Sequence, residues 1–370
     1  MANQPVPDFA AARSRRQQTR AAGLDPNHWY AVARADRLRP GHLEETRFLG
    51  RPIVLFRGAD GVPGAIENRC AHRHVKLSLG QVSGCHVVCA YHGWRYDAAG
   101  RLAAIPHETF GKPIDRIRVA SFPVRQRYGL IWLFPGDPTR AEATAMPEIP
   151  ELESTTPWPH LSIDFTWAAH HSLIVENVSD FTHAHLHRKY RPFSGARLTD
   201  LETVGDQVRL SYDVLVGDGR FSKHFVDRSR VRVDRMELCF DYPYQRSDTG
   251  GRIKHWCFLL PLDDRTTRVF FLFYFDAVRI PLLRLPMPRG LQRVLMLLAR
   301  PLLIRPLLGQ DGGMVEAEQA AYERDPHAAA YELNPAVGAF QDLIVARWRA
   351  HLAGRTAPEA SEPKVAREPA

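Results

Sequence analysis

The sequence predicts an α+β protein with two domains, and three observations lead to this prediction. The chain has 370 residues, which is long enough for two separate hydrophobic cores. Residues 28–140 contain short β-like runs with a turn about every ten residues, as expected of a small all-β domain. Residues 161–352 contain longer β-like runs and helical segments, which favours long antiparallel strands combined with helices.

The N-terminal part of the chain divides into an arm, a β-rich domain and a linker. Residues 1–27 carry an arginine-rich patch, and we expect an arm that is part helical and part loose. Residues 141–160 are rich in Pro, Glu and Thr, which indicates a linker. Between them, strands are expected at 29–33, 52–57, 64–67, 86–90, 95–96, 119–124 and 130–134.

The C-terminal part is expected to form one large sheet with helices. The run 269–275 is apolar throughout, as in a strand that is buried on both faces. We expect a helix at 170–187, a final amphipathic helix at 340–352 and a disordered tail at 353–370. The strands of this domain are expected at 162–167, 198–204, 207–216, 230–242, 254–261 and 268–275.

Residues 279–308 alternate apolar side chains with arginine, and three interpretations are open. The first is an amphipathic helix and its lead-in, packed on the sheet with arginines reaching outward. The second is an apolar lid over a substrate channel. The third is contact with a membrane surface. We rank them in this order.

Charge and cysteine content exclude several classes of function. The formal charge is +8, from 49 Lys and Arg against 41 Asp and Glu, and no Lys/Arg stripe is interleaved with aromatic residues, so we expect no nucleic-acid partner. Two of the five cysteines are candidate metal ligands, described next, and the other three indicate free thiols in a reducing compartment. The sequence shows no secretory start and no apolar run of membrane-spanning length, so we expect a cytoplasmic protein without a transmembrane segment.

The stretch from Cys70 to His92 pairs thiolates with imidazoles. Cys70 and His72 are separated by one residue, and Cys89 and His92 by two. Such donors suit zinc or an iron–sulfur cluster. Each half supplies one sulfur and one nitrogen, which is the ligand set of a Rieske [2Fe–2S] centre, whereas zinc fingers usually pair Cys with Cys. Cys85 lies in the same stretch, but its spacing to His92 does not fit.

A second cluster of metal-binding side chains lies at 176–187. In a helix with ~100° per residue, Asp180, His183 and His187 fall within about 60° of one another on one face. An i, i+4 pair of imidazoles can hold one metal. Two His with a carboxylate from elsewhere form the facial triad of non-haem Fe(II) oxygenases. His185 projects to the opposite side and is the poorer candidate.

Together, the two stretches resemble the oxygenase (α) subunit of a Rieske non-haem iron oxygenase. The resemblance runs from about residue 27 to about residue 352 and implies a small all-β Rieske domain followed by a helix-grip (START-like) catalytic domain with a curved antiparallel sheet. It also implies Asp311 as the third iron ligand, with Glu316 and Glu318 as fallback candidates. The usual family pattern has four residues between the two histidines. Here three lie between His183 and His187, which leaves His185 or His187 as the second ligand, and helix geometry favours His187.

The resemblance further implies a reaction with O2 and electrons that come indirectly from NAD(P)H. A flavin reductase, often with a ferredoxin, would supply them, because this chain has no GxGxxG motif of its own. A hydrophobic, aromatic or polycyclic substrate would be hydroxylated, dihydroxylated, dealkylated or oxidatively cyclised. A head-to-tail homotrimer would place the cluster of one subunit beside the iron of the next. Asp180, with Asn177 one turn earlier, is the catalytic candidate, and Asp180 would bridge to His92 of the neighbour.

Two other classes of function remain open. One is a helix-grip binding module for an apolar ligand with a non-catalytic metal site, which would require incomplete ligand sets. The other is a zinc-stabilised structural protein. Visible absorption by the purified protein separates this last class from the first two, because zinc is colourless.

Overall fold

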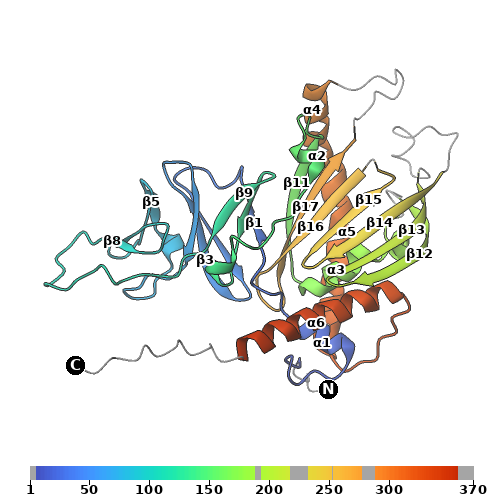
Figure 1. Cartoon of the computed structure of the whole chain (residues 1–370), viewed down its shortest axis with the longest axis horizontal. Coiled ribbons are helices and arrows are strands. Elements are labelled where there is room, and N and C mark those ends of the chain that lie inside the picture. Colours follow the sequence, from blue (N-terminus) through green and yellow to red (C-terminus); the bar gives the residue numbers. More distant parts are fainter. Residues whose placement is uncertain (1–5, 188–192, 217–231, 252, 277–287, 357–370) are drawn as a thin grey trace, which may run out of the picture.

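A computed structural model describes residues 6–187, 193–216, 232–251, 253–276 and 288–356 of the chain. A small β-rich domain lies at one end of the molecule, and a large curved sheet with helices lies at the other (Figure 1). The predicted α+β class, with a small all-β domain and a helix-containing antiparallel domain, is confirmed.

The small domain consists of three antiparallel sheets. Their strand orders are β1-β10-β9, β2-β3-β4 and β5-β6-β7-β8. The strands are β1 (Tyr30–Arg34), β2 (Leu43–Phe48), β3 (Arg51–Arg57), β4 (Pro63–Glu67), β5 (Gln81–Ser83), β6 (His86–Val88), β7 (Arg95–Tyr96), β8 (Leu102–Ala104), β9 (Val124–Arg127) and β10 (Leu130–Leu133), with short 3-10 turns at η1 (Leu77–Leu79) and η2 (Pro138–Arg140).

The large domain is built on one seven-stranded antiparallel sheet. Its order is β11-β17-β16-β15-β14-β13-β12, so neighbouring strands are joined mainly by hairpins. Its strands are β11 (His160–Trp167), β12 (Ser194–Val204), β13 (Gln207–Val216), β14 (Arg232–Asp241), β15 (Tyr244–Thr249), β16 (Ile253–Pro261) and β17 (Thr267–Phe275). Residues 269–272 and 274 of β17 are buried, whereas Phe273 and Phe275 are half-buried, so the burial predicted for 269–275 holds for most of the run.

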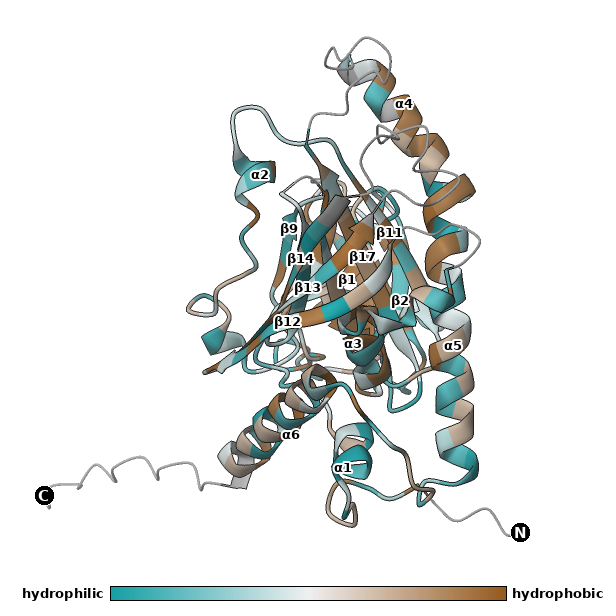
Figure 2. Cartoon of the chain, turned by 90° about the vertical axis from the view of Figure 1, so that its right-hand side faces the viewer, coloured by the Kyte–Doolittle hydropathy of each residue, from teal (hydrophilic) through white to brown (hydrophobic). Residues whose placement is uncertain are grey.

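The helices lie around this sheet (Figures 1 and 2). They are α1 (Arg15–Ala21), α2 (Pro150–Glu153), α3 (His171–Ser179), η3 (Phe181–His185), α4 (Arg289–Ala299), the π-helical turn η5 (Arg300–Ile304), α5 (Arg305–Arg324) and α6 (Pro335–Thr356). The arm is held to the body, because the guanidinium of Arg20 is buried and donates to Glu176 at 2.6 and 2.7 Å.

Three expectations about local structure were wrong. The helix expected at 170–187 ends at Ser179, where Asp180 adopts an extended conformation and caps the 3-10 turn η3. The strand expected at 119–124 begins only at Val124, because Pro123 has no N–H to donate to a ladder. Residues 353–356, expected in the tail, belong to α6, and the remainder, 357–370, lies outside the described residues.

The packing of α4 also differs from the first-ranked interpretation. Several of its leucines and a valine face outward, whereas Gln292 is buried. The lead-in at 277–287 lies outside the described residues.

Candidate functional site

Three residues of the large domain form a metal-binding geometry. The Nε2 atoms of His183 and His187 lie 3.5 and 3.3 Å from the same Oδ1 atom of Asp311. One donor atom from each residue lies within 4.8 Å of the other two. Two imidazoles and one carboxylate that bind a metal from one side leave its opposite side open, which is the arrangement of a facial triad.

Local structure explains why these three side chains meet. Asp180 ends α3 because its Oδ1 accepts from the N–H of Thr182, and a capping aspartate competes with continuation of the helix. The chain then tightens into η3, within which His183 departs from helical geometry. His183 and His187 therefore meet across a turn, and Asp311 reaches them from α5.

The electrostatics of the site match a bound cation. Asp311 is buried, and its Oδ1 has no hydrogen-bond partner among the described residues, although two imidazole nitrogens face it. Burial lowers the pKa of His183, and the charge of Asp311 offsets this only in part. Burial also acts to lower the pKa of His187, but the interaction with the nearby Asp311 carboxylate outweighs burial and raises it. A bound cation would give this buried carboxylate oxygen a partner.

Gln310 is a positioning residue that the sequence did not assign. Its Oε1 lies 3.1 Å from Nδ1 of His187, so that nitrogen donates and Nε2 is left to bind a metal. Its place directly before Asp311 was the only signal available from sequence.

The structure separates the alternative ligands from this site. His185 is exposed. The side chain of Glu316 accepts from the N–H of Ala168 at 2.9 Å, and Glu318 lies 3.3 Å from Arg20. Asn177 lies half-buried on α3.

Asp180 lies beside a hollow of about 410 Å³. Its Oδ1 accepts at 2.9 Å from the side chain of Asn334, which also donates to the hydroxyl of Tyr212 at 2.8 Å. Two residues that line the hollow, Tyr331 and Leu333, are 90% and 91% exposed. The carboxylate is thus fixed next to an open apolar surface.

In the small domain, Cys70 and Cys89 begin two loops of the same design. The N–H of each cysteine donates to the carbonyl five residues later, at Val75 and Trp94. The residue four positions after each cysteine, His74 or Gly93, has a positive φ and donates back to the cysteine carbonyl. The two loops therefore present their side chains in equivalent ways.

These loops bring the two thiols and two imidazoles together. Cys70 and Cys89 are buried free thiols, and burial, followed by the neighbouring Cys70, raises the pKa of Cys89. The rings of His72 and His92 lie 4.6 Å apart. Nδ1 of His72 has no hydrogen-bond partner in the part of the chain that the structure describes. Buried thiols beside imidazoles with a free nitrogen fit an iron–sulfur cluster, whose positive charge would favour the thiolate form.

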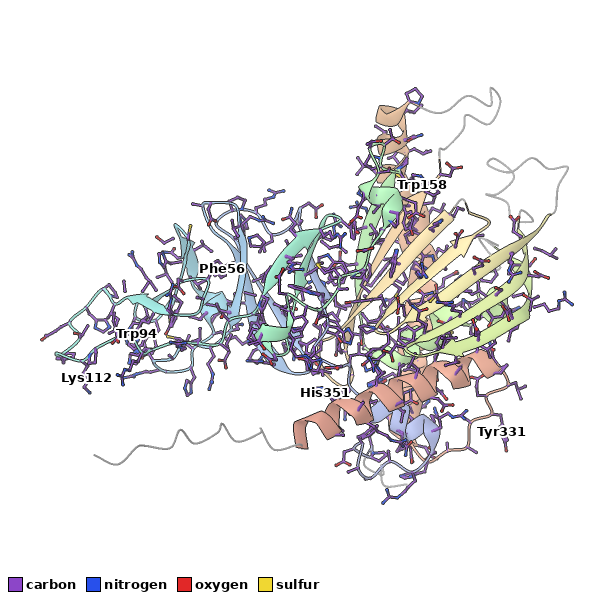
Figure 3. All side chains as sticks on the ribbon, in the orientation of Figure 1. Phe56, Trp94, Lys112, Trp158, Tyr331 and His351 are labelled. Carbon is purple, nitrogen blue, oxygen red and sulfur yellow. The ribbon has the colours of Figure 1, made fainter. Side chains whose placement is uncertain are left out.

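The two sites lie far apart in the folded molecule. Figure 3 labels Trp94, whose ring stacks on His72 at 4.7 Å, and Tyr331 of the hollow beside Asp180 at the far side of the molecule. Cys85 is exposed in the turn between β5 and β6.

Comparison with known proteins gives two family matches, one relative that is similar along the whole chain and another that is similar along about half of it. Residues 28–123 match the Rieske [2Fe-2S] domain, and residues 167–355 match the vanillate O-demethylase oxygenase C-terminal domain. The chain is 43% identical to a 4beta-methylsterol monooxygenase of Methylococcus capsulatus, over 100% of this chain and 98% of that protein. It is 33% identical to the oxygenase component of dicamba O-demethylase of Stenotrophomonas maltophilia, over 52% of this chain and 53% of that protein.

Solved structures share the fold. The crystal structure of dicamba monooxygenase bound to dicamba has a TM-score of 0.70 at 21% identity, and the alignment covers 90% of this chain and 100% of that chain. Pseudomonas putida NdmA with caffeine has a TM-score of 0.63 at 21% identity, with 91% of each chain covered. Among the described residues, no helix is long and apolar enough to cross a membrane.

Proposed function

Because the chain belongs to the Rieske non-haem iron oxygenases, as an oxygenase component, we propose that it is a monooxygenase that hydroxylates a methyl group of a sterol-like substrate. The family assignment makes it a Rieske non-haem iron monooxygenase or O-demethylase with a [2Fe–2S] cluster and a mononuclear iron site. The observation that carries the choice of substrate is the 43% identity to a 4beta-methylsterol monooxygenase along the whole chain.

The chain's own residues have distinct roles in this proposal. His183, His187 and Asp311 would hold the iron, which when bound supplies an open position for O2 beside the substrate. Gln310 orients His187. The rings of Phe181 and Phe193 lie 6.2 and 6.1 Å from that of His183, so they help keep water from that side of the site.

Cys70, His72, Cys89 and His92 are the proposed ligands of the cluster. A reductase partner is implied by the relative that is an oxygenase component, and we propose that a flavin reductase or ferredoxin delivers NAD(P)H-derived electrons to this end of the molecule. The free thiols are consistent with a reducing compartment such as the cytoplasm.

A substrate panel tests the reaction. The iron-loaded protein, a surrogate reductase and NADH should convert a 4-methylsterol to a product with one added oxygen atom. A methoxylated aromatic acid is the second candidate, favoured by the match to the vanillate O-demethylase domain, and would release formaldehyde. Turnover of the aromatic acid but not the sterol would reverse the order of the two candidates.

We also propose that electrons pass between subunits of a head-to-tail trimer. The hollow beside Asp180 exposes Tyr331 and Leu333, and the cluster end of the small domain exposes Leu79 and Tyr91. The two apolar surfaces would cover one another between neighbouring subunits. His92 of one subunit would then meet Asp180 of the next.

Complementation between two inactive variants tests this arrangement. Cys89→Ser removes a cluster ligand, and Asp311→Ala removes an iron ligand. Co-expressed, the two should form mixed oligomers with some interfaces that pair an intact cluster with an intact iron site, and activity should partly return. A monomeric protein with full activity, or mixed oligomers without recovered activity, would contradict the arrangement.

Asp180→Asn tests the connecting residue. The variant side chain has the same size, so iron content and cluster reduction should persist. It lacks the charge that would hold two imidazoles across the interface. Cluster oxidation by O2 and substrate in a single turnover should slow by orders of magnitude. Oxidation at the wild-type rate would remove Asp180 from the electron path.

A further inference from the structure

Helix α4 presents an apolar face to solvent. Leu291, Val294 and Leu298 are 51%, 52% and 53% exposed, and Leu297 is 62% exposed. At ~100° per residue these four positions form one stripe of about 120°. The opposite side of the helix is turned to the protein, where Gln292 is only 5% exposed. An amphipathic helix that only packed on the core would turn its apolar stripe toward the protein and its polar side toward solvent.

Arginine is the only charged residue type in this part of the chain. Residues 288–310 contain Arg289, Arg293, Arg300 and Arg305 and no Asp or Glu. Arg289 and Arg293 are the only charged residues within α4 itself. Arg305 is exposed at the start of α5. An exposed apolar stripe on a helix that carries arginine and no acidic residue is the pattern of a helix that lies in the interface of an anionic membrane.

Within the described part of the chain, the position of α4 leaves this face accessible. The helix extends past the end of the large sheet and is continuous through η5 with α5 (Figure 1). Figure 2 shows mainly hydrophobic colours on α4 and more hydrophilic colours along α5. Asp311 lies 12 residues beyond the end of α4, which is about 18 Å of helix. A surface that held α4 would therefore lie near the iron site.

We propose that α4 binds the surface of an anionic phospholipid bilayer, with its axis in the membrane plane and its apolar stripe among the acyl chains. Charge favours this partner over the same face of a second copy, because two segments that carry arginine and no acidic residue would repel one another. The interaction goes beyond the proposed oxygenase reaction, and binding can be measured without turnover.

Vesicle co-sedimentation of the iron-loaded protein tests the proposal. Vesicles of phosphatidylcholine alone are compared with an equal mixture of phosphatidylcholine and phosphatidylglycerol, at low and high salt. Wild-type protein should sediment with the anionic vesicles, less at high salt, and weakly with phosphatidylcholine alone.

A matched pair of valine variants locates the contact. Val294→Glu places a charge in the apolar stripe and should lower the vesicle partition coefficient by about tenfold or more. Val204→Glu is the control, because Val204 is 51% exposed at the end of β12, in another part of the molecule. It should bind as the wild type does. Normal secondary structure and iron content in both variants exclude misfolding.

Three results would overturn the proposal. The first is wild-type protein that stays in solution with anionic vesicles. The second is equal binding by the two variants. The third combines two findings: the wild type does not bind vesicles, and light scattering shows that Val294→Glu has a different oligomeric state from the wild type. This face would then be a contact between subunits.

Discussion

Gly312 allows α5 to approach the large sheet closely enough to place Asp311 in the iron site. A Cβ atom added to Gly312 would lie 2.4 Å from Nε1 and 2.7 Å from Cε2 of Trp167. The indole is 4% exposed, and the rings of Phe165 and Phe271 lie 5.4 and 6.1 Å from it, so it has little room to move. Gly312→Ala should therefore push α5 away from β11 and shift Asp311.

Gly313 provides the control for this substitution. It is the next residue of α5 and is exposed, and an added Cβ would meet nothing within 4 Å. Both substitutions gain about 1 kcal/mol from helix propensity, so this gain cancels in the comparison. Only Gly312→Ala has the overpacking cost of about 1–3 kcal/mol. At about 2–4 °C per kcal/mol, it should melt about 2–12 °C below Gly313→Ala.

Thermal melting of the metal-free and iron-loaded proteins, with iron analysis after dialysis, provides the assay. We expect Gly312→Ala to have the lower Tm and to lose iron, and Gly313→Ala to match or exceed the wild-type Tm with full iron. Equal melting temperatures and equal iron contents for the two alanine variants would refute the close approach of α5 to Trp167.

Three further predictions follow from the sites. His183→Ala and His187→Ala should empty the iron site and leave the visible spectrum of the cluster intact, whereas His185→Ala should keep its iron; iron loss from His185→Ala alone would contradict this ligand set. Gln310→Leu should weaken iron binding by about ten- to a hundredfold, because His187 loses the acceptor that orients it, and wild-type affinity in a chelator competition would exclude this role. Burial lowers the pKa of His171 from 6.5 to about 4. The free energy of unfolding is therefore unaffected by this group above pH 6.5 and falls as the pH drops toward 4, because only the unfolded state binds the proton in this range. The loss should be about 2 kcal/mol at pH 5. His171→Gln, which can still donate to the carbonyl of Ala22, should lose less stability than the wild type between pH 7 and pH 5 in urea unfolding; an equal loss would show that another group controls the acid transition.

The candidate cluster ligands could be proposed from sequence because their pattern is local, whereas Asp311 came only from the family resemblance. Cys70, His72, Cys89 and His92 lie in two short loops, and the spacing of the donors identifies the kind of cluster. The α+β class and most strands of the large sheet followed from hydrophobic patterns. Strand β15 was missed because its buried side chains include the polar Gln245 and Ser247. The domain limits 28–140 and 161–352 stay a prediction.

The errors arose where a side chain interacts with the backbone or where tertiary packing decides. Asp180 was placed on the face of a continuous helix, yet its carboxylate ends that helix by capping the next turn. His183 and His187 were correctly paired, although the continuous helix that predicted the pairing is absent. Periodicity identifies the apolar stripe of α4, but it does not say whether that stripe faces the core or the solvent. The contacts of Asn334 with Asp180 and Tyr212 join residues more than a hundred positions apart and carry no local signal.

The central claim is that one chain holds a Rieske cluster and a separate mononuclear iron. The most direct test is metal and sulfide analysis of protein purified without oxygen, for the wild type and Asp311→Ala side by side. The account predicts about three irons and two acid-labile sulfides per wild-type chain, and about two irons with two sulfides in the variant. Zinc as the stoichiometric metal without sulfide, or an unchanged iron content in Asp311→Ala, would contradict it.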